Sequence, residues 1–207
     1  MVPGMGRRGV HRPAVAAGIV SEVLAPAPVV TAMLLAAAAV TAPTRAEAVR
    51  NALIAAVFGA LVPLGFVLYQ VHRRRFTDHH VSVRAQRPIV FAVALLSVLL
   101  GTGLLVGLGA PRALLGVIVA GIIGIAICGL ITTVWKVSVH AATFTGSVVL
   151  LAYLLGPVAL ALLAAVPLVG WARVAVGGHT PAEAAGGTVV GGVVAAVAFP
   201  LVTGLPR

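Results

Sequence analysis

The sequence predicts an all-α integral membrane protein, a polytopic helical bundle of six to seven spans. Of its 207 residues, 61% are hydrophobic and only 9% are charged, and the mean hydropathy is +1.16. An average globular protein carries roughly 25% charged residues, so this chain has too few to cover a water-soluble surface. The composition therefore excludes a soluble enzyme, a nucleic-acid-binding protein and a disordered chain.

The few charged residues are strongly unbalanced. Lys and Arg number 14 against 4 Asp and Glu, for a formal net charge of +10, and the cations lie between apolar runs. At a membrane surface such cations meet anionic head groups and phosphates. The single cysteine, Cys128, lies within an apolar run, so no disulfide is expected.

Seven apolar segments make up the predicted bundle. A helix needs about 20 apolar residues to cross ~30 Å of hydrocarbon. The candidates are residues 24–42, 51–71, 88–109, 112–134, 141–155, 157–172 and 184–203. Gly156-Pro157 separates the fifth segment from the sixth, because proline removes a backbone donor and favours a turn or a sharp kink. Gly187 and Gly191 form a small-xxx-small pair, which lets helices approach closely.

Residues 1–23 are expected to be a basic N-terminal tail. This stretch carries Arg7, Arg8 and Arg12, and the apolar run behind them, Ala14–Val20, is short and stops at Ser21-Glu22. These features favour a cytosolic tail over a cleaved signal peptide. Residues 24–207 then form a single transmembrane helical domain.

The number of crossings brings three polar stretches to one face of the membrane. The third and fourth segments return the chain from the loop at 72–87 to the same side at 136–140. The fifth and sixth segments return it again at 173–179. The sequence thus predicts that three distant parts of the chain meet on one side.

The last of these stretches carries the most informative pattern. Thr180-Pro181-Ala182-Glu183 predicts a helix start with a capping box, so Glu183 has a structural explanation as well as a functional one. His179 precedes the cap, beside a helix N-terminus whose free N–H groups and dipole favour an anion. Gly177-Gly178 lets the backbone approach a ligand closely, and Arg173 lies six residues before His179.

The other two stretches are ambiguous when each residue is considered alone. Arg73-Arg74-Arg75 fits a positive-inside anchor. Arg87-Pro88 opens a span, where an arginine can reach an anion at the interface. Lys136 fits a snorkelling interfacial cation, and His140 fits a packing histidine.

Taken together, these residues resemble the motifs of the type 2 phosphatidic acid phosphatase superfamily, in its membrane branch, which is related to vanadium haloperoxidases. That family carries Lys-x6-Arg-Pro, then Pro-Ser-Gly-His, then Ser-Arg-x5-His-x3-Asp. The third motif is matched by Ala172-Arg173-x5-His179-x3-Glu183, and the second in part by Ser138 and His140. The first keeps Arg87-Pro88, with His80 at the lysine position. Order and approximate spacing agree over about residues 50–203.

The resemblance implies a metal-independent membrane phosphatase that works through a phosphohistidine. His179 would be the nucleophile, Glu183 would orient it through the other ring nitrogen, and His140 would protonate the leaving oxygen. Arg87 and Arg173 would clamp the phosphoryl oxygens bidentately. Supplementary phosphate contacts would come from Ser138, Lys136, His80 and Arg84.

Several positions depart from the family's motifs. Ala172 replaces serine, Glu183 replaces aspartate, and Val137 and Val139 stand where the family has proline and glycine. His80 replaces lysine, so its charge depends on pH, with a reference pKa near 6.5. Two functions therefore stay open: a lipid-phosphate phosphatase, and a catalytically impaired lipid-phosphate-binding or scaffold protein of the same fold.

Neither a metal nor another cofactor is expected. A magnesium site normally needs clustered carboxylates, and the four acidic residues, Glu22, Glu47, Asp78 and Glu183, are far apart in the sequence. Asp78-His79-His80 offers transition-metal ligands, but with no further clear ligand it ranks well behind the phosphate site. A transporter is disfavoured because segments 88–134 carry only Arg112, at a turn.

The expected partner is a membrane lipid or isoprenoid phosphate. Phosphatidic acid, phosphatidylglycerol phosphate and polyprenyl phosphates or diphosphates all keep a tail in the bilayer while the phosphate reaches the arginines. Apart from the four basic residues that would bind phosphate, six basic residues lie on the site's face of the membrane and four on the opposite face. This small excess favours a cytosolic site. The Ala/Val/Gly/Arg-rich composition suggests a bacterial cell membrane. The sequence does not indicate an oligomeric state.

Overall fold

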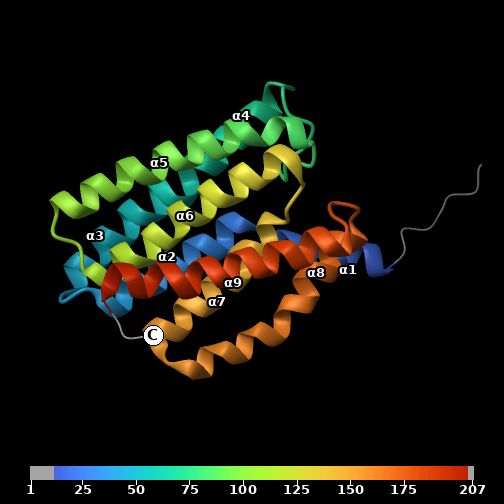
Figure 1. Cartoon of the computed structure of the whole chain (residues 1–207). Coiled ribbons are helices and arrows are strands. Elements are labelled where there is room, and N and C mark those ends of the chain that lie inside the picture. The colour runs from blue at the N-terminus through green and yellow to red at the C-terminus, as the bar shows by residue number, and fades with distance from the viewer. Residues whose placement is uncertain (1–11, 205–207) are drawn as a thin grey trace, which may run out of the picture.

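The computed structural model describes residues 12–204, and every regular element in that range is helical (Figure 1). In chain order the elements are α1 (Arg12–Val23), α2 (Pro26–Thr41), α3 (Arg45–Ala56), the π-helical turn η1 (Val57–Leu61), α4 (Val62–His72), the 3₁₀ turn η2 (Arg84–Gln86), α5 (Arg87–Gly107), α6 (Arg112–Val134), α7 (Val139–Leu155), the 3₁₀ helix η3 (Pro157–Ala165), α8 (Val166–Ala175) and α9 (Pro181–Thr203). Arg7, Arg8 and Arg207 lie outside the described residues.

Six helical runs are long and apolar enough to cross a membrane. They are Ala14–Thr41, Arg45–His72, Arg84–Gly107, Arg112–Val134, Pro157–Ala175 and Pro181–Thr203, and α7 is a seventh, shorter apolar helix. These segments confirm the predicted all-α integral membrane bundle of six to seven spans. The break at Gly156-Pro157 is also confirmed: Gly156, at φ +97°, ends α7, and Pro157 begins η3.

The N-terminal segment differs from the expectation. Residues 12–23, assigned by the sequence to a tail, form α1, which packs against α8. The expectation treated Ala14–Val20 as an isolated short run. In the structure α1 leads through a turn at residues 24–25 into α2, and together they form one 28-residue run.

Apolar side chains of α2, α3, α5, α6, α7 and α9 form the main core. Leu105, Leu114 and Phe199 are almost completely buried in it. Large apolar side chains also cover the outside of the bundle, and Val134 and Val158 are both 79% exposed. Such a contiguous apolar exterior fits a surface that faces lipid rather than water.

Helices α7 and α9 touch through their backbones. A Cβ atom at Gly187 would overlap the carbonyl oxygen of Ser138, and one at Gly191 would overlap the carbonyl oxygen of Ala142. The predicted small-xxx-small pair therefore does pack two helices closely. This contact fixes the start of α9 beside the start of α7.

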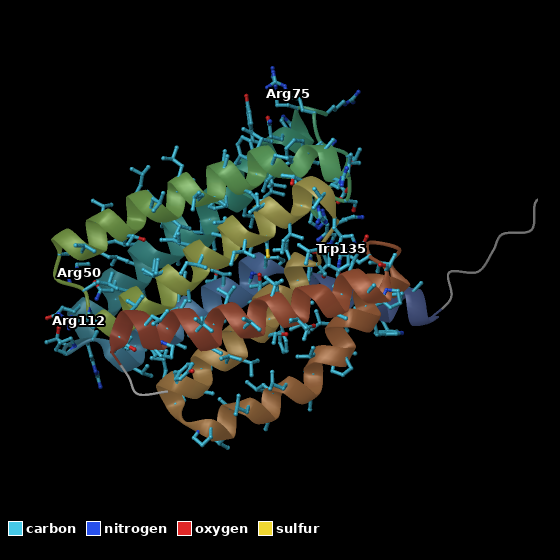
Figure 2. The ribbon with its side chains drawn as sticks, viewed as in Figure 1. Arg50, Arg75, Arg112 and Trp135 are labelled. Carbon is cyan, nitrogen blue, oxygen red and sulfur yellow. The ribbon has the colours of Figure 1, made fainter. Side chains whose placement is uncertain are left out.

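Charged and polar side chains gather at the two ends of the bundle. Arg50 and Arg112 lie at one end, whereas Arg75 and Trp135 lie at the other (Figure 2). The segments after α4, α6 and α8 all lie at the Arg75 end, together with α1 (Figure 1). The three polar stretches are therefore on one face of the bundle, as the number of crossings predicted.

Candidate active site

Arg87, at the start of α5, connects all three polar stretches. Its Nε donates to the carbonyl oxygen of Val81 and one terminal nitrogen donates to the carbonyl oxygen of Val137, both at 3.0 Å. The other terminal nitrogen lies 3.4 Å from Nε2 of His179. Val81 has φ +51°, a conformation that β-branched residues rarely adopt. The buried guanidinium is thus held from two sides and points at the imidazole.

The His179 ring is fixed from its opposite edge by Glu183. Nδ1 of His179 lies 3.0 Å from Oε2 of Glu183, and the same oxygen accepts a hydrogen bond from the backbone N–H of Thr180 at 3.0 Å. The Thr180 hydroxyl accepts from the Glu183 N–H at 3.2 Å, which completes the predicted capping box. The two explanations of Glu183 are therefore not exclusive, because one carboxylate serves both contacts.

These partners assign the proton on the His179 ring. A carboxylate only accepts, so Nδ1 carries the hydrogen, and the guanidinium of Arg87 only donates, so Nε2 presents its lone pair. Burial lowers the pKa of His179 to about 4, and the charge of Arg87 adds to this effect. At neutral pH His179 is therefore an uncharged imidazole whose Nε2 carries no proton.

Arg173 supplies a second buried guanidinium, only 2% exposed. One terminal nitrogen donates to the hydroxyl of Ser21 on α1. Its carbonyl oxygen accepts hydrogen bonds from the backbone N–H groups of Gly178 and His179. A Cβ at Gly178 would stand 2.5 Å from the other terminal nitrogen, so a larger residue there would displace the guanidinium. Nε of Arg173 has no hydrogen-bond partner in the described part of the chain.

The start of α7 brings Ser138 and His140 to the same place. Ser138 is completely buried, caps α7 by accepting from the Ala141 N–H at 3.4 Å, and donates its own N–H to the carbonyl oxygen of Glu183 at 3.1 Å. His140 is also buried, and its Nε2 lacks a hydrogen-bond partner among the described residues. An unpartnered buried imidazole nitrogen is available to a ligand.

Lys136 ties two of the loops together. Its Nζ donates to the carbonyl oxygen of Gly178 at 2.7 Å. Burial and the nearby charge of Arg87 lower the pKa of Lys136. The ammonium group keeps two further donors for an anion.

His80 and Arg84 stand in different places. Nε2 of His80 lies 2.9 Å from Oε1 of Glu22, and its ring centroid is 5.2 Å from that of His140, at the edge of the buried site. Arg84 is exposed and donates to the carbonyl oxygen of Val134, the last residue of α6, at 2.8 Å. There it offsets the negative end of the α6 dipole. The structure therefore places His80 beside His140, whereas Arg84 contacts the end of α6.

The contribution of α1 was not predicted from the sequence. Ser21 contacts Arg173, and Glu22 contacts His79 and His80. The available signal was Glu22 itself: it is one of only four acidic residues and ends an apolar run, and acids in such positions are usually paired.

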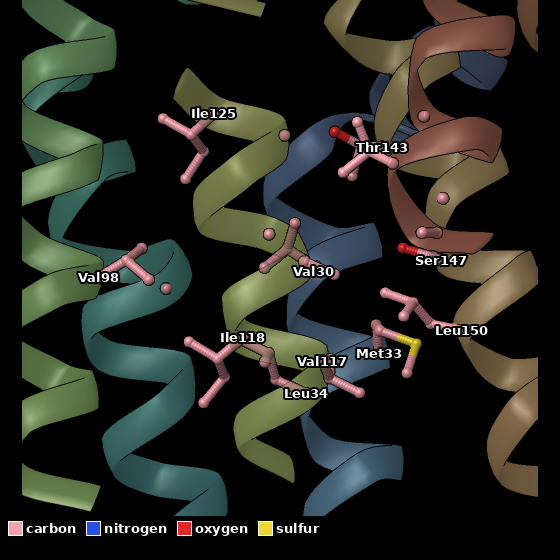
Figure 3. Close-up of a pocket in the computed structure, with 18 of the residues that line it drawn as sticks. Val30, Met33, Leu34, Val98, Val117, Ile118, Ile125, Thr143, Ser147 and Leu150 are labelled. Atoms are coloured by element: carbon pink, nitrogen blue, oxygen red, sulfur yellow. The ribbon is translucent and has the colours of Figure 1, made fainter. Parts of the chain in front are cut away.

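An apolar cavity of about 170 Å³ lies among the helices of the bundle (Figure 3). It begins at Phe91, Cys128 and Val139 and continues past Val98 and Leu150. Phe91 lies one helical turn after Arg87, on the same side of α5. From Val139 to Leu150 the helix rises by about 16 Å, so the lining follows α7 for about three turns.

The electrostatic balance of the site is strongly positive. In the described part of the chain, neither Arg87 nor Arg173 has a carboxylate oxygen within 4.0 Å. Buried charges are normally paired, because an isolated charge loses its hydration without compensation. The arrangement is therefore suited to an anion with several oxygens.

No protein-family model, curated protein or solved structure matches the chain.

Proposed function

We propose that the protein is a membrane phosphatase that removes phosphate from a lipid phosphate or prenyl (di)phosphate through a phosphohistidine. The observation that carries this proposal is the pair of buried guanidinium groups, which have no carboxylate partner among residues 12–204, beside an imidazole whose unprotonated Nε2 faces Arg87. A phosphoryl group would satisfy both arginines and present its phosphorus to His179. The resemblance of the three polar stretches to the phosphatidic acid phosphatase motifs supports the same chemistry.

In the first step Nε2 of His179 attacks phosphorus, and the bond from phosphorus to the leaving oxygen breaks. The Nδ1 proton stays hydrogen-bonded to Glu183, which balances the positive charge that develops on the ring. Arg87 and Arg173 hold the equatorial oxygens, where the transferred phosphoryl group carries its charge. Ser138 and Lys136 supply further donors, and His80 lies at the edge of the site.

His140 then acts twice. The dianionic phosphate favours its protonated form, and the imidazolium gives its proton to the leaving alkoxide. In the second step the neutral ring takes a proton from water as the water attacks the phosphohistidine. The products are the dephosphorylated lipid and inorganic phosphate, and His179 and His140 return to their starting states. No step requires a metal ion.

The apolar cavity supports a lipid substrate over a soluble phosphate ester. Its lining includes Phe91, one helical turn after Arg87, and Val139, next to His140 in the sequence, and is almost entirely hydrocarbon. A chain inserted there would let the phosphate remain at the arginines while one tail stays among the helices. The substrate class is therefore an amphiphile with a terminal phosphate, such as phosphatidic acid, phosphatidylglycerol phosphate or a polyprenyl phosphate.

The experiment is phosphate release from a panel of these lipids by the purified protein in detergent with EDTA. His179→Ala removes the nucleophile, and His72→Ala, an exposed histidine at the end of α4, is the matched control. We expect wild type and His72→Ala to release phosphate and His179→Ala to release none. If folded wild-type protein releases no phosphate from any lipid, the chain is the impaired lipid-phosphate-binding or scaffold protein. Val139 and His80, which depart from the family's motifs, are then the first positions to examine.

A further inference from the structure

A second cluster of ligating side chains lies beside the phosphate site and connects α1 to the loop before α5. Nε2 of His79 and Nε2 of His80 each lie 2.9 Å from Oε1 of Glu22. The two imidazole centroids are 4.2 Å apart. The ligating atoms of all three residues lie within 4.8 Å of one another. Three groups from distant parts of the sequence therefore face one small volume.

We propose that Glu22, His79 and His80 bind a divalent transition-metal ion of the zinc type. Imidazole nitrogens and carboxylate oxygens bind Zn²⁺ at about 2.0–2.2 Å, and in tetrahedral coordination such ligands stand about 3.4 Å apart. The two separations of 2.9 Å need to open by about half an ångström to admit the ion. Small side-chain rotations achieve this.

The ligand types select the class of metal. Two imidazoles suit zinc, copper, iron or nickel, whereas magnesium and calcium prefer carboxylate, carbonyl and water oxygens. Three protein ligands leave a fourth position for water. The side chains of His79 and Glu22 are 44% and 56% exposed, so an ion has access from solvent.

The site would fix α1 against the rest of the bundle. Ser21, next to Glu22, contacts the buried guanidinium of Arg173. An exposed His–Glu ion pair alone contributes little to stability, whereas a metal ion shared by α1 and the loop at 73–83 joins them firmly. This role is structural, goes beyond the proposed phosphatase chemistry and requires no step of it.

Zinc binding by metal-stripped, full-length protein in detergent tests the site. Calorimetry with Zn²⁺ gives the stoichiometry and affinity, thermal unfolding gives the stabilisation, and Co²⁺ gives the visible absorption of a tetrahedral site. Glu22→Gln keeps the size and hydrogen-bonding ability of the side chain, and His79→Ala removes one imidazole. His72→Ala is again the control, and Mg²⁺ is the control ion.

We expect one Zn²⁺ per chain, a higher melting temperature with Zn²⁺ but not with Mg²⁺, and a tetrahedral Co²⁺ spectrum. Glu22→Gln and His79→Ala should each weaken Zn²⁺ binding by more than the roughly 10–100-fold that loss of a ligand's hydrogen-bond partner costs, and His72→Ala should not. Wild-type protein that fails to bind Zn²⁺, or variants that bind it equally well, would overturn the assignment. These readouts are independent of phosphate release, which tests the phosphatase proposal separately in EDTA.

Discussion

Glu183→Ala tests whether the Glu183 carboxylate orients His179 or only caps α9. Oε2 of Glu183 is shared by Nδ1 of His179 and the backbone N–H of Thr180, each at 3.0 Å. Loss of a helix cap costs about 1 kcal/mol, so the free energy of unfolding should fall by about that amount. Loss of the partner that fixes an imidazole tautomer costs far more in rate, and phosphate release should fall by ~10²–10⁴-fold.

Thr180→Ala is the matched control for this change. The Thr180 hydroxyl accepts from the Glu183 N–H at 3.2 Å and belongs only to the cap. We expect a similar loss of stability, about 1 kcal/mol, with phosphate release close to wild type. Denaturant unfolding in detergent and phosphate release, measured on the same preparations, give both quantities. If Glu183→Ala loses stability but releases phosphate like Thr180→Ala, the carboxylate is a cap and does not orient His179.

Three further predictions follow from the packing, the ionisation and the cavity. Gly187→Ala places a methyl group against the α7 backbone and should lower the free energy of unfolding by about 1–3 kcal/mol. Gly192→Ala is the control: its methyl group meets only a side-chain methyl at 3.4 Å and should not destabilise the fold. Because the pKa of His179 is lowered to about 4, the acid limb of kcat/KM should lie near pH 4; an acid limb at pH 6.5 or above would contradict this. Gly124 lines the cavity, so the side chain of Gly124→Leu should occupy it and raise KM for long-chain but not for short-chain phosphates. Gly103→Leu lies outside the cavity and should change KM for neither substrate class.

Local sequence patterns were sufficient for the bundle and for the meeting of the polar stretches. Apolar length predicted the spans, Gly156-Pro157 predicted the end of α7, and Thr180–Glu183 predicted the start of α9. The number of crossings predicted that the Arg87 and His179 stretches would meet, and their 3.4 Å separation confirms it. Each of these inferences depends on neighbouring residues or on a count of segments, which a single sequence supplies.

Partners that depend on tertiary packing were not predictable in this way. Ser21 and Glu22 reach the site only because α1 packs against α8, and no local pattern specifies that contact. Arg84 was expected among the phosphate contacts, and the sequence did not indicate the acceptor that it has in the structure, the carbonyl oxygen of Val134 at the end of α6. The backbone carbonyl that holds Arg87 at Val81 depends on a left-handed conformation that the sequence gives no reason to expect at a valine.

Trapping the covalent intermediate tests the central claim most directly. Wild-type protein would be mixed briefly with its best lipid phosphate in EDTA, quenched, digested, and mapped by mass spectrometry under alkaline conditions that preserve phosphohistidine. We expect phosphate on His179 in wild-type protein and none in His179→Ala. Phosphate release that continues in His179→Ala, with no phosphorylated histidine in wild type, would contradict it.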